Sequence, residues 1–175
     1  TLRSSDLMAV LEVLHFPDER LRKKALPVEQ IDDSIGEIAS NMLETMYAEG
    51  GIGLAATQVN IQQRIVVIDL SEDKSQPLVL INPEVIAERG KETMKEGCLS
   101  VPDYFDIVER AEEITFRYQN LQNETIETET NGLLAVCVQH EIDHLNGRLF
   151  IDYLSPLKRE RLKKKISKQE RQQQK

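Results

Sequence analysis

The chain has 175 residues, a size typical of one domain, and 40% of them are hydrophobic, which allows a core and excludes global disorder. No apolar run approaches the roughly 18 residues of a membrane span, and no charged-then-apolar leader opens the sequence. Without an export signal, the two cysteines indicate metal binding rather than a disulfide, so a cytoplasmic location is expected.

Hydrophobic patterning in the first half of the chain predicts one helix and two buried strands. Apolar residues recur at helical spacing over residues 33–46, and a glycine-rich loop follows at residues 50–53. Residues 64–70 and 78–81 are rich in Val, Ile and Leu, which is typical of buried strands. The second of these strands is expected to end at Asn82-Pro83.

The second half is predicted to contain two more strands and a buried helix. Residues 114–118 and 124–130 show the alternation of a half-buried and an exposed strand. A helix over residues 133–146 is expected to begin after an Asn131 cap and to end at Gly147. Its first half is apolar on every side, so protein should surround it.

A His-Glu-x-x-His pattern lies inside this helix at His140, Glu141 and His144. Residues four apart share one helix face, about one turn (~5.4 Å) along the axis, so two imidazoles can bind one metal ion. Glu141 can then reach a water at that metal. The chain has only three histidines, so this spacing favours a metallohydrolase over two histidines packed in a core.

The two histidines leave a catalytic metal site one protein ligand short. Downstream of His144 the first carboxylate is Asp152, near the helix end, and no further histidine follows. Cys137 lies three residues before His140 on the metal face, but its aliphatic surroundings are typical of core packing. Cys98 follows a glycine that permits close backbone approach, so it is the favoured ligand and Cys137 the alternative.

Three segments resemble, in order and with suitable gaps, the motifs of one family. They are Gly51-Ile52-Gly53-Leu54-Ala55-Ala56-Thr57-Gln58, then Glu96-Gly97-Cys98-Leu99-Ser100, and then Gln139-His140-Glu141-Ile142-Asp143-His144. The family is the peptide deformylases, metal-dependent hydrolases that remove the N-formyl group from the formyl-methionine of newly synthesised polypeptides and release formate. The resemblance spans residues 8–170.

The resemblance implies a role for each matching residue. Water would fill the fourth position of a metal held by Cys98, His140 and His144. Glu141 would act as general base and then as general acid. The negative charge that develops on the formyl oxygen would be stabilised by two donors, the Gln58 side-chain amide and the Leu99 backbone N–H.

The resemblance also implies a substrate site. The peptide backbone would lie beside Ile52 and Gly53 as an added strand, and the methionine side chain would enter a pocket walled by residues that are equally compatible with plain core packing: Leu133, Val136 and Cys137. Phe105 stands where many bacterial relatives carry an arginine, so an apolar or stacking contact is expected there. The implied cofactor is one divalent ion per chain, Fe²⁺ in the cell, although the same ligand set accepts Ni²⁺, Co²⁺ or Zn²⁺.

The C-terminal segment differs sharply in charge from the rest of the chain. Ser155-Pro156 supplies a cap and first-turn pair for a final helix. Residues 158–175 carry nine Lys and Arg against two Glu, a charge of +7 that leaves −15 for residues 1–157. Such a basic segment fits a polyanionic partner, and for a deformylase the ribosome exit region is the hypothesis; the alternative is a solvated helix. No membrane or DNA partner is expected.

These predictions combine into an α+β fold with antiparallel or mixed sheets wrapped around a buried metal-binding helix, followed by a C-terminal helix. Residues 8–157 are interpreted as a single catalytic metallohydrolase domain, and residues 1–7 as a remnant of cloning. Two alternatives remain: an endopeptidase that uses the same helix with another third ligand, and a metal-binding protein without catalysis.

Overall fold

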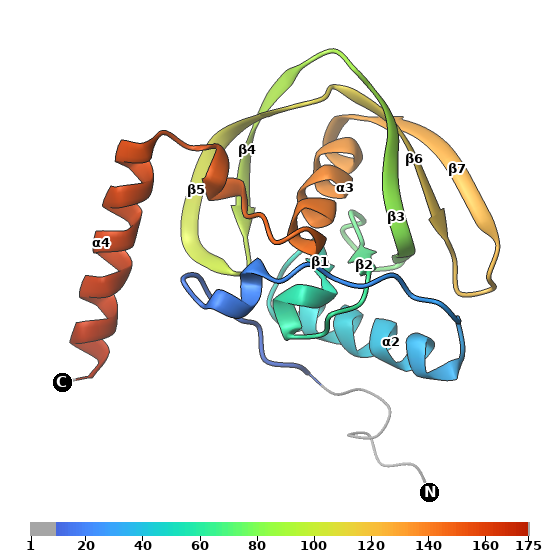
Figure 1. Ribbon diagram of the computed structural model, residues 1–175, viewed down its shortest axis with the longest axis horizontal. Helices are drawn as coiled ribbons and strands as arrows, with labels where there is room; N and C mark the ends of the chain where they lie inside the picture. The colour runs from blue at the N-terminus through green and yellow to red at the C-terminus, as the bar shows by residue number, and fades with distance from the viewer. Residues whose placement is uncertain (1–9, 175) are drawn as a thin grey trace, which may run out of the picture.

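The computed structural model describes residues 10–174 and contains two antiparallel sheets (Figure 1). The five-stranded sheet has the order β1-β2-β3-β6-β7, and β4 and β5 form a separate hairpin. The strand bounds are Gly53–Ala55 (β1), Ile65–Ile68 (β2), Leu78–Arg89 (β3), Glu92–Cys98 (β4), Val101–Arg110 (β5), Glu113–Gln119 (β6) and Thr125–Asn131 (β7). The interpretation of residues 1–7 falls outside the described residues.

Helix α3, Gly132–Leu145, lies between the β4–β5 hairpin and strands β3, β6 and β7 (Figure 1). Ala135, Val138 and Leu145 are completely buried, in a cluster that includes residues of β2, β3 and β6. Asn131 occupies the predicted cap position, but its side chain makes no capping hydrogen bond. The α+β fold with sheets around a buried helix is therefore confirmed.

Helix α2, Asp33–Ala48, covers one end of the five-stranded sheet. The Asp32 side chain caps it by accepting hydrogen bonds from the Ser34 and Ile35 N–H groups. Met42 and Met46 on its apolar face are fully buried against residues of β1 and β2. Three short 3-10 helices complete the connections near the site: Glu19–Arg22 (η1), Ala56–Val59 (η2) and Phe150–Tyr153 (η3).

Two sequence predictions about the strands were wrong or incomplete. Strand β3 does not end at Asn82-Pro83 but continues to Arg89. Asn82 has a φ of 52°, and the register with β6 shifts between Ile81 and Glu84, so the proline sits in an irregularity where no ladder hydrogen bond is required of it. The β4–β5 hairpin was not predicted, because charged residues interrupt the apolar alternation along both of its strands.

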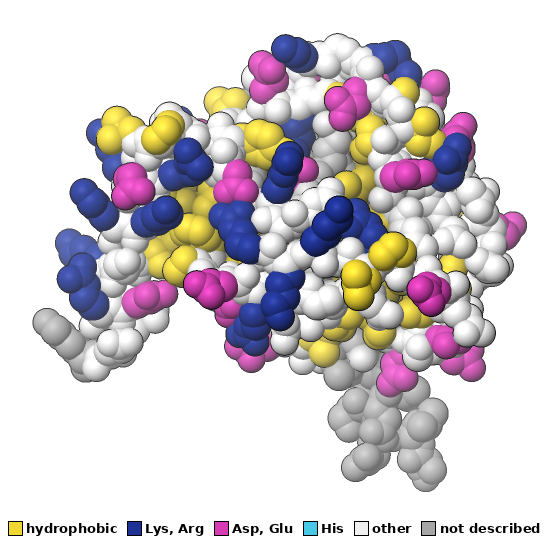
Figure 2. All heavy atoms as spheres, viewed as in Figure 1, with side chains coloured by type: hydrophobic (Ala, Val, Ile, Leu, Met, Phe, Trp, Pro, Cys, Tyr) yellow, Lys and Arg dark blue, Asp and Glu magenta, His cyan; other side chains and the backbone are white. Residues whose placement is uncertain are grey.

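Helix α4, Pro156–Gln173, lies next to β5 at one side of the molecule (Figure 1). The Ser155 hydroxyl accepts a hydrogen bond from the Lys158 N–H, as the predicted cap requires. Leu162 is buried with residues of η3 and β5, whereas most of the Lys and Arg side chains of α4 point to solvent (Figure 2). Within residues 10–174 we find no helix with the length and hydropathy needed to cross a membrane.

Candidate active site

A group of metal-binding side chains forms where the end of β4 meets the C-terminal half of α3. The Cys98 Sγ atom lies 3.2 Å from His144 Nε2, which lies 3.2 Å from His140 Nε2. A tetrahedral ion with bonds of about 2.0–2.3 Å holds its ligand atoms roughly 3.3–3.7 Å apart. All three ligand atoms lie within 4.8 Å of one another, so the donor set fits one metal ion.

Cys137, the alternative ligand, is not part of the group formed by Cys98, His140 and His144. It is buried on α3, and burial, with added repulsion from Glu141 and Glu96, raises the pKa of its thiol to about 12. A thiol that stays protonated at neutral pH is a poor metal ligand, because the thiolate is the form that binds. Cys137 instead lines the cavity beside the group.

Buried ionic contacts fix the orientation of His140. Its Nδ1 atom lies 2.8 Å from Glu96 Oε1, which leaves Nε2 directed toward Cys98 and His144. Arg110 donates two hydrogen bonds to the Glu96 carboxylate, at 2.6 and 3.0 Å, and a third to Asp143 at 2.9 Å. Burial raises the Glu96 pKa, but the hydrogen bonds from His140 and Arg110 outweigh it and hold that pKa below its usual value.

Arg110 was not predicted to be a site residue, and no role was predicted for Glu96. The Glu96 and Arg110 side chains are each only 4% exposed, so burying their charges costs desolvation energy. The pair therefore serves to position the metal ligand His140, and not only to stabilise the fold. Glu96 stood within a recognised motif, but Arg110 lies in a hairpin that the periodicity did not reveal. Nothing in the local sequence distinguishes it from a surface arginine.

Gln58 is held with its amide nitrogen toward the metal-binding group. Its Oε1 atom accepts a hydrogen bond of 2.9 Å from the Ala55 N–H, and its Nε2 donates to the Ser100 hydroxyl at 3.0 Å. The same nitrogen lies 3.5 Å from Cys98 Sγ. Because both ends of the amide are engaged, the donor direction is set before any substrate arrives. Leu99 follows Cys98 in the turn and lines the cavity.

Glu141 presents a buried carboxylate to the cavity. Burial raises its pKa to about 7, and its Oε1 atom has no hydrogen-bond partner among the described residues. The backbone of Gly53 approaches this carboxylate so closely that a β-carbon there would lie 2.5 Å from Glu141 Oε2. The close contact with Glu141 of the third motif therefore requires a glycine at position 53 of the first motif.

We expect Gly53→Ala to lower kcat by roughly 10²-fold, because displacing a reacting group by about 1 Å can cost that much. The added methyl group must push the Glu141 carboxylate from its place. Steady-state kinetics with a formylated peptide measures the effect. Gly36→Ala is the matched control, since nothing lies within 4 Å of a β-carbon at Gly36. Equal activity of Gly53→Ala and the parent protein would contradict the close contact.

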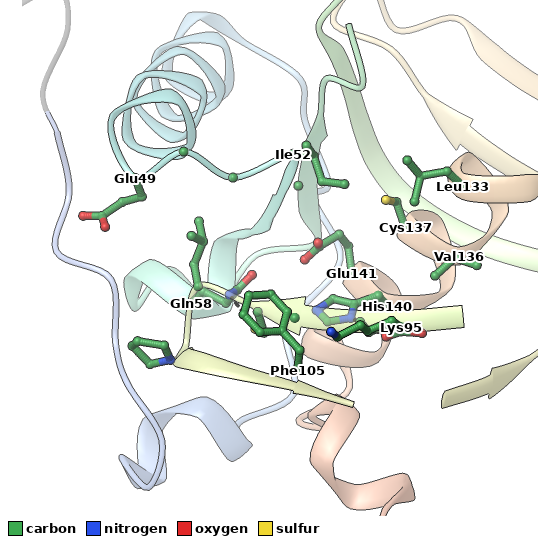
Figure 3. Close-up of a pocket in the computed structure, with 18 of the residues that line it drawn as sticks. Glu49, Ile52, Gln58, Lys95, Phe105, Leu133, Val136, Cys137, His140 and Glu141 are labelled. Carbon is green, nitrogen blue, oxygen red and sulfur yellow. Dashed lines mark hydrogen bonds and ion pairs between the residues drawn. The ribbon is translucent and has the colours of Figure 1, made fainter. Parts of the chain in front are cut away.

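A cavity of about 570 Å³ opens beside the metal-binding group. The residues predicted to contact substrate all line it: Ile52, Gly53, Leu133, Val136 and Cys137. Leu133, Val136 and Cys137 extend from α3 on one side of Glu141, and Gln58 lies on the other side (Figure 3). Leu133 is 46% exposed and Ile52 45% exposed, so these two residues face the opening rather than a closed core. The cavity thus joins an apolar wall to the polar group.

A Cys-His-His group, a buried carboxylate beside it and an apolar cavity define a metal-dependent hydrolase. Comparison with known proteins gives the family: residues 10–160 match the polypeptide deformylase family. The chain belongs to the polypeptide deformylases, which remove the N-formyl group from nascent peptides.

Relatives match nearly the whole chain. A peptide deformylase from Nitrosococcus oceani is 58% identical, covering 94% of this chain and 98% of its own length. One from Pseudoalteromonas translucida is 59% identical, covering 93% and 97%. The crystal structure of the Legionella pneumophila enzyme superimposes with a TM-score of 0.89 at 46% identity, covering 95% of this chain and 99% of that one. The Ehrlichia chaffeensis enzyme solved in complex with actinonin gives 0.88 at 41% identity, covering 94% and 99%.

Proposed function

We propose that the residues around this cavity divide the deformylase reaction among themselves as the three motifs imply. Cys98, His140 and His144 hold one divalent metal ion, and Glu141 moves the protons. The observation that carries this proposal is the convergence of the three ligand atoms beside a carboxylate that is buried and has an uncommitted oxygen. When bound, the metal polarises the formyl oxygen and brings the pKa of a water to about 7.

Glu141 acts first as a base and then as an acid. It takes a proton from the attacking water and delivers it to the departing amine of the methionine. A pKa of about 7 suits both directions of transfer at neutral pH, since the carboxyl group can be found in either state. The buried position also keeps bulk water from competing for the proton.

Gln58 and Leu99 stabilise the charge that develops on the formyl oxygen. The Gln58 Nε2 is already aimed toward Cys98, and the Leu99 N–H follows the same ligand in the turn. Donors that need no reorientation stabilise a transition state more than a ground state, and losing one typically costs about 10²–10³ in rate. The methionine side chain lies against Ile52, Leu133, Val136 and Cys137, which line the apolar side of the cavity.

The substrate backbone runs beside Ile52 and Gly53. Strand β1 begins at Gly53 and is an edge of the five-stranded sheet, paired only with β2 in that sheet. An extended peptide can therefore be added along it, with main-chain hydrogen bonds that do not depend on side-chain identity. This suits an enzyme whose substrates share only the first residue.

We expect N-acetyl-Met-Ala-Ser to be hydrolysed at least about 10²-fold more slowly than formyl-Met-Ala-Ser. The formyl carbon carries a hydrogen where the acetyl carbon carries a methyl group, and Gly53, Glu141 and Gln58 leave little room near the ligands. Parallel assays of formate and acetate release measure the ratio. Similar rates for the two peptides would show that the site does not select by size.

For the metal we propose Fe²⁺ in the cell. One thiolate and two imidazoles accept iron, nickel, cobalt and zinc, so availability rather than the ligand set decides occupancy. A ferrous enzyme with a thiolate ligand should lose activity in air by oxidation, whereas the zinc-loaded protein should not. Elemental analysis of protein purified without oxygen, from cells grown without added metal, tests the assignment; zinc as the dominant ion in that preparation would contradict it.

We also propose a cytoplasmic enzyme with residues 8–157 as its catalytic unit and the basic residues 158–175 as a docking element for the ribosome exit region. The support is the exposed Lys and Arg side chains of α4 (Figure 2), together with substrates that are nascent chains.

We expect reversal of three exposed lysines of α4, Lys163, Lys164 and Lys168 to Glu, to abolish co-sedimentation with ribosomes at low salt. Leu162 stays in place, so the helix keeps its buried anchor. Binding of the parent protein should also fall steeply with added salt. The matched control reverses three exposed lysines of the body, Lys24, Lys74 and Lys91. Unchanged sedimentation of the α4 variant would refute the docking proposal.

A further inference from the structure

The outer face of the β4–β5 hairpin carries an exposed apolar surface next to the cavity. In the hairpin register Lys95 pairs with Ile107 and Gly97 pairs with Phe105, so these four residues share one face of the sheet. Phe105 is 59% exposed and Ile107 63% exposed. The opposite face, with Glu96, Val108 and Arg110, is buried. We call the surface formed by Lys95, Phe105 and Ile107 the hairpin surface.

The Phe105 ring is held in place rather than loosely displayed. It lies over Gly97, where an added β-carbon would overlap the ring, so the absence of a side chain there creates its seat. The Lys95 ammonium group lies 5.8 Å from the ring centroid, a cation–π contact. Among the described residues Lys95 forms no ion pair, which leaves its charge available to a ligand.

The hairpin surface is continuous with the catalytic cavity. Lys95, Gly97 and Phe105 line the cavity, whereas Ile107 lies outside its lining. Figure 3 shows the Phe105 ring and Lys95 beside each other at the cavity. Residues two apart on a strand are about 6.4–6.8 Å apart, which is also the length of two residues of an extended peptide. A peptide that leaves the cavity over Phe105 therefore reaches Ile107 about two residues later.

The occupant that fits is the polypeptide substrate itself. A cavity of about 570 Å³ is the size of a small-molecule site and cannot enclose a polypeptide, so the chain beyond the first residues must run over the surface. Two apolar side chains and one cation make too small an area for a stable protein partner, which needs about 800 Å² on each side. A chain already tethered by its formylated end needs far less contact.

We propose that the hairpin surface is a secondary substrate-binding site that contacts the nascent peptide beyond its third residue and favours apolar side chains there. This inference rests on the proposed function, because the peptide must enter with its formyl end at the metal-binding group. Contact far from the reacting bond is the same in the ground state and the transition state, so it should lower KM and leave kcat unchanged.

The test compares formate release from formyl-Met-Ala-Ser, formyl-Met-Ala-Ser-Ser-Ser and formyl-Met-Ala-Ser-Leu-Leu. We expect the Leu-Leu peptide to exceed the Ser-Ser peptide in kcat/KM by roughly fivefold, the gain from partly removing one leucine from water. In Ile107→Ser this advantage should fall below about twofold, while the tripeptide keeps its parent kcat/KM. Ile86→Ser, at an exposed apolar residue of β3 outside the cavity lining, is the matched control and should change nothing.

An equal kcat/KM for the two pentapeptides in the parent protein would overturn the inference, as would an undiminished advantage in Ile107→Ser. The proposed function fails separately, by absence of formate release from the tripeptide. Because Ile107 is mostly exposed, its substitution should not affect folding, and the tripeptide rate reports this directly.

Discussion

Glu141→Gln is expected to lower kcat for formyl-Met-Ala-Ser by roughly 10²–10⁴-fold without loss of metal. The amide has nearly the volume of the carboxylate, so the contact with Gly53 and the shape of the cavity are preserved. It cannot take the proton of the attacking water or deliver one to the leaving amine. Glu141 is not among the three clustered ligand residues, so metal content should stay at its parent value.

Formate release and elemental analysis on the same preparation measure this result. Glu109→Gln, at an exposed position of β5, controls for removal of one negative charge. Activity within about tenfold of the parent value would remove Glu141 from the proton-transfer role. Loss of metal together with activity would instead show that Glu141 supports the ligands.

Cys98→Ala is expected to reduce bound metal to near zero and formate release to background, whereas Cys137→Ala should retain both. Removing Cys98 leaves two imidazoles, too few protein ligands for a stable catalytic site. Cys137 lies outside the ligand group, and its thiol has a pKa of about 12, so its removal takes no donor from the metal. Elemental analysis after extensive dialysis separates the two variants.

The paired cysteine variants also identify the third ligand. Metal retained in Cys98→Ala would show that a residue other than Cys98 completes the ligand set. Circular dichroism checks that each variant is folded. Cys137 is 6% exposed and Cys98 is partly exposed, so a folding defect, if any, should fall on the Cys137 variant that keeps its metal.

The helices and the metal-binding group could be predicted because their signals are local. The pattern of residues 33–46 anticipated α2 within two residues at its end, since one apolar face against a sheet imposes helical spacing. His140 and His144 share a face of α3 by helix geometry alone. Selecting Cys98 over Cys137 relied on the loop context and the family resemblance, and the ligand distances now agree with that choice.

The remaining features depend on contacts that no local pattern encodes. The continuation of β3 past Pro83 requires a bulge, whose position is set by pairing with β6. The hairpin was not predicted because charged residues interrupt the apolar alternation of its strands, and its inner face buries the ionic pair of Glu96 and Arg110. The role of Arg110 emerges only when β5 lies beside α3, where it also reaches Asp143.

The most direct test of the account is formate release from formyl-Met-Ala-Ser by protein purified without oxygen, normalised to the metal content of the same sample. The expected result is turnover that scales with bound metal, approaches one ion per chain at full activity, and disappears in Glu141→Gln. Protein that carries a full complement of metal at Cys98, His140 and His144 and yet releases no formate would contradict it.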